Sequence, residues 1–128
     1  MASPSFAAPP RVREHFDAPR NVGSFASETP GVVTGHAGNA AHGALLRLQL
    51  LVDGERIRDT RFKAFGCGYS IACGSLLSEL VKGSTLAEAR ALGPQALIDR
   101  LELPADKRYT AELALEALEA ALQAHSRQ

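Results

Sequence analysis

The chain has 128 residues, which is long enough for one compact domain that buries its own core without disulfides or a structural metal. Fourteen basic side chains balance fourteen acidic ones and no lysine or arginine cluster stands out, which argues against nucleic-acid binding and against an anionic membrane surface. No apolar stretch approaches bilayer length, and the N-terminus lacks the pattern of a signal peptide, so we expect a cytoplasmic protein.

The N-terminal region is predicted to contain little regular structure. Residues 1–10, rich in alanine, proline and serine, are expected to form a disordered tail, and residues 11–128 to form a single domain. Residues 11–16 are compatible with about one helical turn that ends before Pro19. After a loop, the β-branched segment 32–36 predicts a short first strand.

Two longer strands are predicted in the middle of the chain. A glycine-rich turn at residues 38–43 leads into residues 44–52, where apolar and polar side chains alternate, as is typical of a strand with one buried face. Asp53 and Gly54 favour a tight hairpin, and residues 57–65 return as a third strand. The hairpin makes antiparallel pairing the simplest arrangement.

Helices are predicted to follow the strands. Apolar residues at helical spacing indicate a helix over residues 69–82. Ser84 or Thr85 can cap a short helix with Glu88 at the acceptor position of a capping box, and Pro94 to Ile98 predicts another short helix.

The last predicted element is a long amphipathic helix from Thr110 to Ala124. Strands early in the chain and helices late in it indicate an α+β domain. We therefore expect a small three-stranded antiparallel sheet with helices packed on one face, including this long C-terminal helix.

Two cysteines are candidates for chemistry. Cys67 lies between Gly66 and Gly68, where a predicted strand meets a helix N-terminus whose unpaired N–H groups and dipole favour a thiolate. The alternative for Cys67 is a small apolar residue in a tight turn. Cys73 falls about one turn into the helix, where a buried thiol is the usual outcome.

His42 and His36 flank the glycine-rich turn, and each is either a metal ligand or an ordinary exposed histidine. The six-residue spacing of the cysteines differs from the short pairs of structural zinc sites, so spacing alone predicts no preformed site. A thiol enzyme with Cys67 as nucleophile and His42 as base is a further alternative, but no oxyanion partner can be named, and we expect no enzymatic activity.

Two stretches carry a specific resemblance to a known family. Residues 15–23 are similar to the opening His-Tyr-x-x-Pro-Arg-Asn-Val-Gly of the NifU/IscU iron-sulfur cluster assembly scaffolds, and residues 61–68 resemble the family's Phe-Lys-x-Tyr/Phe-Gly-Cys-Gly segment. The similarity continues in order through shorter stretches at Ile71 to Leu76, Val81 to Gly83 and Leu101 to Pro104. It therefore covers the chain from about Val12 to the C-terminal helix and implies a NifU/IscU-like domain.

The resemblance implies a site at which the family holds an iron-sulfur cluster, or zinc in isolated preparations, with three cysteines, an aspartate and sometimes a histidine. Cys67 is retained. His42 stands where the family has its first cysteine, and Ala44 stands where it has the aspartate. Tyr109 and Thr110 replace a His-Cys pair, and neither is a usual ligand for iron or zinc.

We therefore expect a scaffold-like protein that binds a [2Fe-2S] cluster or iron through Cys67 and His42, with zinc as an alternative in the isolated protein. Because a [2Fe-2S] cluster normally takes four protein ligands, the set would be completed by Cys73, by His36 or by the second subunit of a homodimer, or no cluster would be held.

The resemblance also implies partners. Residues 19–23 and Cys67 resemble the portion of the family that meets a cysteine desulfurase. Residues 103–107 read Leu-Pro-Ala-Asp-Lys where the family has Leu-Pro-Pro-Val-Lys, and the lost proline and added charge argue against recognition by an Hsp70-type chaperone. The alternative function is a non-catalytic adaptor that binds a desulfurase or another assembly partner without holding a cluster.

Overall fold

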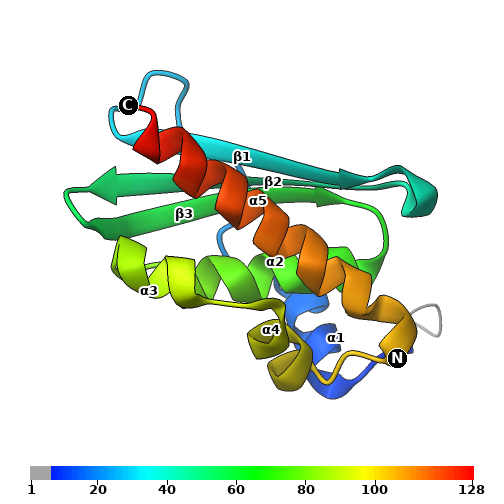
Figure 1. Cartoon of the computed structure of the whole chain (residues 1–128). Coiled ribbons are helices and arrows are strands. Elements are labelled where there is room, and N and C mark those ends of the chain that lie inside the picture. Colours follow the sequence, from blue (N-terminus) through cyan, green and yellow to red (C-terminus); the bar gives the residue numbers. More distant parts are fainter. Residues whose placement is uncertain (1–6) are drawn as a thin grey trace.

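A computed structural model describes residues 7–128, so most of the predicted tail lies outside the described residues. The chain forms an antiparallel sheet of three strands in the order β1-β2-β3, with the helices α2 (Gly68–Val81) and α5 (Arg108–Ser126) on one face (Figure 1). The strands and the 3-10 turn that joins the first two are β1 (Val32–Asn39), η1 (Ala40–His42), β2 (Ala44–Asp53) and β3 (Arg56–Phe65). The predicted α+β class is confirmed.

The alternation predicted for the second strand is also confirmed. Leu46, Leu48 and Leu50 are fully buried on the helix-covered face, whereas Arg47 and Gln49 are half-buried on the other. β1 is longer than predicted, because pairing with β2 continues from Val32 as far as Asn39, through the residues expected to form a turn.

The helices follow in the predicted order. They are α1 (Pro10–Asp17), α2 (Gly68–Val81), α3 (Leu86–Ala91), α4 (Pro94–Leu101), the 3-10 turn η2 (Ala105–Lys107) and α5 (Arg108–Ser126). Thr85 caps α3 with both hydrogen bonds of the predicted capping box. In the described part of the chain, no helix is long and apolar enough to cross a membrane.

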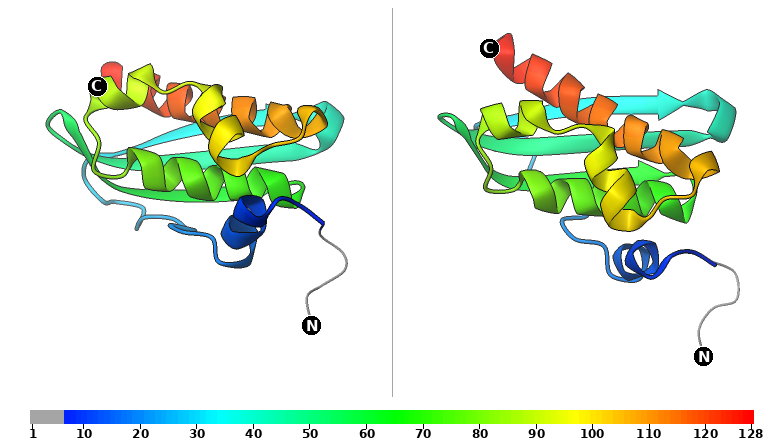
Figure 2. Two further views of the ribbon diagram at one scale, coloured as in Figure 1. Left: turned by 90° about the horizontal axis from the view of Figure 1, so that it is seen from below. Right: turned by 60° about the horizontal axis from the view of Figure 1, so that its bottom comes forward.

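The first helix is longer than the single turn expected from the sequence. α1 begins at Pro10, a favourable first residue because proline has no N–H to leave unpaired, and it buries Val12 and His15. Figure 2 shows α1 beneath α2, on the side away from α5.

Two glycines allow the helices to approach the sheet closely. A Cβ atom on Gly35 of β1 would lie 2.1 Å from the carbonyl oxygen of Ala117 in α5, and one on Gly74 of α2 would lie 2.6 Å from the ring of Phe62. Both helices therefore press on the sheet at positions where only glycine fits.

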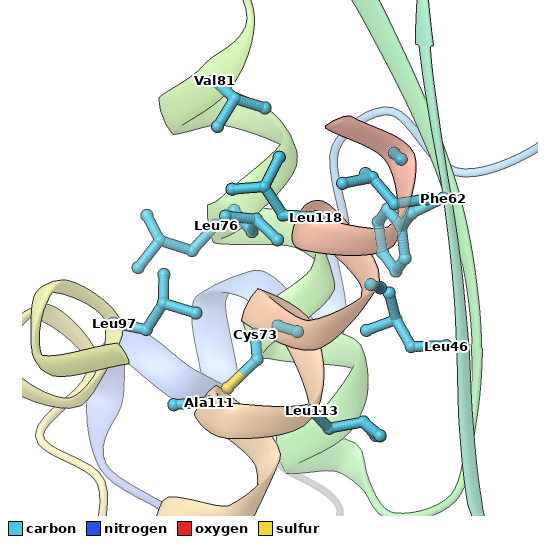
Figure 3. Packing of buried hydrophobic residues seen from close by; sticks show 14 of the residues in the cluster. Leu46, Phe62, Cys73, Leu76, Val81, Leu97, Ala111, Leu113 and Leu118 are labelled. Atoms are coloured by element: carbon cyan, nitrogen blue, oxygen red, sulfur yellow. The ribbon is translucent and has the colours of Figure 1, made fainter. Parts of the chain in front are cut away.

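The core lies between the sheet and these helices. Figure 3 shows Cys73 of α2 in this layer, with its sulfur toward Ala111 of α5. Cys73 is fully buried, as are Leu46 and Phe62 on the sheet.

The N-terminal segment is attached to α2 by hydrogen bonds from its characteristic residues. Ser75 accepts from the backbone N–H of Arg20 at 2.9 Å, and its hydroxyl lies 2.7 Å from Nδ1 of His15. The side chain of Asn21 donates to Ser78 at 3.0 Å. The opening stretch that resembles the NifU/IscU family therefore fixes this segment against the helix that follows Cys67.

Candidate functional site

Cys67 occupies the N-cap position of α2, and only Gly66 separates it from the end of β3. Gly66 makes this turn possible because its φ of +136° lies in a region that favours glycine. The thiol is half-buried at the positive end of a helix of 14 residues. The predicted position of Cys67, between a strand and a helix N-terminus, is thus the one observed.

The surroundings of Cys67 favour its thiolate. Burial alone would raise the pKa of Cys67, but hydrogen bonds from the backbone N–H of Ser70, the hydroxyl of Tyr109 and the backbone N–H of Tyr69 outweigh it, so the pKa lies below the ordinary value of a thiol. The Sγ atom is 3.7 Å from Oη of Tyr109 and 3.9 Å from Oγ of Ser70. The Cys67 thiol therefore loses its proton more readily than an ordinary thiol does.

Tyr109 joins Cys67 to His42. Tyr109 is the second residue of α5, and its ring is stacked on the imidazole of His42 in η1, with centroids 3.8 Å apart and planes 12° apart. Burial and the nearby Cys67 raise the pKa of Tyr109 to about 12, so its hydroxyl stays protonated and donates to the sulfur. Three elements that are distant in sequence thus meet at one end of the fold.

Cys73 lies outside this group. It is fully buried between α2 and α5, and burial raises the pKa of its thiol to about 12. Its Sγ atom lies 3.3 Å from Oγ1 of Thr110, whose hydroxyl donates to the carbonyl oxygen of Lys107. Cys73 and Thr110 therefore contact each other in the interior.

His36 and Ala44 are the remaining residues that the sequence analysis considered for the site. His36 is exposed on β1 opposite Arg47, on the sheet face that the helices leave uncovered. Ala44 is buried at the start of β2, and a Cβ atom on Gly66 would lie 3.3 Å from it. The structure brings Ala44 next to the turn that carries Cys67 but leaves His36 outside that group of contacts.

The donors of one chain do not fit a complete cluster site. A [2Fe-2S] cluster takes four protein ligands, preferably soft thiolates. Across residues 7–128, no three histidine, cysteine, aspartate or glutamate side chains are grouped so that they could hold a metal ion. Cys67 and His42 are usual donors for such a metal, and Tyr109 lies in contact with both.

Tyr109 is the residue whose part in the site the sequence did not predict. It was expected only as a replacement for a missing ligand, whereas the structure makes it the contact between the two candidate donors. The sequence feature that could have indicated this role is an aromatic residue at the start of the last helix, at a position that the resemblance assigns to a ligand of the family.

An exposed apolar pair lies beside the site. Leu45 and Phe65 are cross-strand partners in β2 and β3, and they keep 45% and 62% of their surface exposed. Phe65 is separated from Cys67 only by Gly66. Exposed apolar residues that cluster, as this Leu45–Phe65 pair does, are typical of surfaces that contact another protein.

Two hollows in the surface lie away from Cys67. One, of about 560 Å³, is lined by α3 and by the outer side of α5, including Leu92, Leu115 and Glu116. The other, of about 520 Å³, is lined by α1, α2 and α4 around His15 and Arg100. Neither hollow is lined by Cys67, His42 or Tyr109.

Comparison with known proteins gives a consistent result. A family model described as the NifU-like N terminal domain matches residues 9–128. The iron-sulfur cluster assembly scaffold protein IscU of Escherichia coli (strain K12) is 42% identical over 113 residues, which cover 88% of this chain and 88% of that protein. The iron-sulfur cluster assembly protein 2 of Arabidopsis thaliana is 45% identical over 112 residues, which cover 87% of this chain and 69% of that protein.

A solved structure gives a similar match for the fold. The N-terminal part of a nitrogen-fixing NifU-like protein from Brucella abortus superposes with a TM-score of 0.67 at 19% identity, over 92% of this chain and 91% of that chain. At this identity the match supports the fold alone.

Proposed function

The chain belongs to the NifU/IscU family of iron-sulfur cluster assembly scaffolds, and we propose that it carries iron or an iron-sulfur cluster as cargo, with Cys67 as the anchoring thiolate and His42 as the second donor. The observation that supports this most directly is the half-buried Cys67 at the helix N-terminus, whose pKa is lowered. The relatives are named as assembly and scaffold proteins rather than enzymes, which favours cargo binding over a thiol enzyme and over an adaptor that holds no cluster.

A second copy of the chain would supply the donors that one chain lacks. Two copies together offer two Cys67 thiolates and two His42 imidazoles, and cysteine and histidine pairs are known to ligate [2Fe-2S] centres. Because Cys67 is half-buried and His42 exposed, both lie near the surface at one end of the fold. A homodimer that shares one cluster therefore agrees with the ligand requirement, and a single zinc ion is the alternative cargo of the isolated protein.

Anaerobic reconstitution with iron and sulfide tests this proposal. We expect visible absorption of a cluster at one [2Fe-2S] per two chains, together with a shift to a dimer in size-exclusion chromatography. Cys67→Ser should abolish uptake, whereas Cys73→Ala, which removes the buried thiol, should retain it. If the visible absorption stays flat and no iron is retained, the cargo role is lost.

Ligand restoration gives an independent check. The double variant His42→Cys/Ala44→Asp should increase iron uptake, because it adds a soft thiolate and a carboxylate near Cys67. The single variant Ala44→Asp serves as the control for the carboxylate alone. Unchanged uptake in the double variant would mean that missing ligands do not limit binding.

We further propose that a cysteine desulfurase docks on the Leu45–Phe65 pair. The pair presents exposed apolar surface next to Cys67, where a sulfur donor must approach. In a pull-down with purified desulfurase, Phe65→Asp should lose binding and Cys67→Ser should keep it. Ala91→Asp, at an exposed residue of α3 that is distant in sequence from the site, is the matched control. An equal loss of desulfurase binding in both aspartate variants would exclude the Leu45–Phe65 pair as the docking surface.

A further inference from the structure

Tyr109 contacts both proposed donors at once. Its hydroxyl oxygen lies 3.7 Å from Sγ of Cys67, and its ring covers one face of the His42 imidazole at 3.8 Å. Within the described part of the chain, no hydrogen bond joins Cys67 directly to His42. Tyr109 therefore links the sulfur to the imidazole through two contacts, one to each donor.

This position conflicts with a metal ion that binds Cys67 on the side of the sulfur that faces the phenol. Zinc bound to a cysteine lies about 2.3 Å from the sulfur, so an ion on the line from Sγ toward the phenol would be only about 1.4 Å from Oη, which is shorter than the roughly 2.0 Å of a metal–oxygen bond. An ion approaching from this side must either be bound by Tyr109 or displace it. The stacking on His42 holds the ring where the displacement is needed.

We propose that Tyr109 is a shutter that keeps Cys67 and His42 from sharing a metal ion until its ring swings away. The inference rests on the proposed function, because it takes Cys67 and His42 as the donors. Since the ring is held by one hydrogen bond and one stacking contact, and Tyr109 is half-buried near the start of α5, it can rotate without unfolding the helix. Tyr109 thereby determines how readily this end of the fold accepts a metal.

Cobalt(II) titration tests the shutter, with thiolate-to-cobalt charge-transfer absorption as the readout for Cys67. Tyr109→Ala removes both contacts and should tighten cobalt binding by about tenfold or more. Tyr109→Phe keeps the stacking and loses the hydroxyl that blocks the sulfur, but it also loses a hydrogen bond that lowers the pKa of Cys67, so its gain should be smaller. Circular dichroism confirms folding, and Tyr109→Leu, closer in volume to tyrosine, replaces Tyr109→Ala if the latter does not fold. Cys67→Ser gives the baseline without the thiolate.

A parallel series in a His42→Cys background separates the shutter from the proposed function. Tighter binding on Tyr109→Ala in both backgrounds supports the shutter and His42 as donor. Tighter binding only in the His42→Cys background supports the shutter and removes His42 from the proposed donor set. Weaker or unchanged binding on Tyr109→Ala in both backgrounds overturns the shutter, and weaker binding would identify Tyr109 as a ligand instead; the reconstitution of the unchanged protein then still decides the proposed function.

Discussion

The imidazole of His42 lies flat against the phenol ring of Tyr109, with centroids 3.8 Å apart and planes 12° apart. Stacked aromatic pairs of this kind contribute about 0.5–1.5 kcal/mol beyond the burial of their surface. Tyr109 also hydrogen-bonds to Cys67, so this one residue is in contact with both His42 and Cys67. This end of the fold is therefore held together by protein contacts, and any cargo must compete with them.

The hydrogen bond from Tyr109 should be visible in the reactivity of Cys67. Tyr109→Phe removes a donor to the thiolate, so the pKa of Cys67 should rise and the fraction of thiolate at neutral pH should fall. We expect alkylation by iodoacetamide at pH 7 to slow by about threefold or more, in line with the free-energy equivalent of a pKa change. The measurement is the alkylation rate across pH 6 to 10.

A matched variant makes this result specific. His42→Ala removes the stacking partner but leaves the hydroxyl of Tyr109, so it should change the rate less than Tyr109→Phe does. If the pH profile of Tyr109→Phe coincides with that of the unchanged protein, Tyr109 does not stabilise the thiolate.

The second cysteine should not react in the folded protein. Cys73 is fully buried, and burial raises the pKa of its thiol to about 12, so its thiolate is scarce at pH 8. Intact-mass spectrometry after brief alkylation should show one adduct per native chain and two per denatured chain. Cys67→Ser should then show none in the native state. Two adducts forming at similar rates in the native protein would contradict the buried position of Cys73.

Much of the fold was accessible from the sequence because it follows from local patterns. Alternation over residues 44–52 predicted a strand with one buried face, and Leu46 and Leu48 are fully buried there. The capping box at Thr85 was predicted from two side chains three residues apart, and both of its hydrogen bonds form. Such features depend on neighbouring residues, so they are visible without the tertiary structure.

The candidate site was less predictable because it depends on packing between distant elements. The glycine-flanked position of Cys67 could be assigned to a strand–helix junction, since its neighbours are local. The stacking of His42 on Tyr109 joins a turn in the first half of the chain to a helix near its end, and no spacing rule connects them. The extent of β1 was underestimated for the same reason, because its pairing through Gly38 depends on β2.

The close approach of α5 to β1 predicts a strong difference between two glycines of the same strand. Gly35→Ala would place a Cβ atom 2.1 Å from a backbone oxygen of α5, which neither element can avoid without moving. Overpacking of this kind typically costs about 1–3 kcal/mol, and a clash with backbone should reach the upper end. Gly38→Ala meets its nearest atoms at 3.6 Å, an ordinary contact, and serves as the control.

Urea denaturation measures both variants. The free energy of unfolding should fall by about 2 kcal/mol or more for Gly35→Ala and change little for Gly38→Ala. Equal effects would show that α5 does not lie as close to β1 as the structure places it.

The attachment of the N-terminal segment should make stability depend on pH through His15. Burial and the neighbouring Arg20 lower the pKa of His15, and Arg11 acts in the same direction. Glu79 and Glu14 raise this pKa, but the net shift is downward. The geometry agrees with a neutral ring, because the Ser75 hydroxyl already accepts from the backbone N–H of Arg20 and can donate its own proton to Nδ1.

The sign of the effect follows from linkage. Because the pKa of His15 is lower in the folded state, the unfolded chain binds the proton more readily, and the stabilisation is complete only above the unfolded pKa of about 6.5. This stabilisation is lost as the pH falls through the pKa of His15 in the folded state.

We expect the free energy of unfolding to decrease by up to about 1 kcal/mol between pH 7.5 and pH 5.5 because of His15. In His15→Gln this part of the decrease should disappear, whereas His125→Gln, outside the network, should keep it. An unchanged pH dependence in His15→Gln would show that the proton affinity of His15 is not coupled to folding, and that the N-terminal segment is held by its other hydrogen bonds.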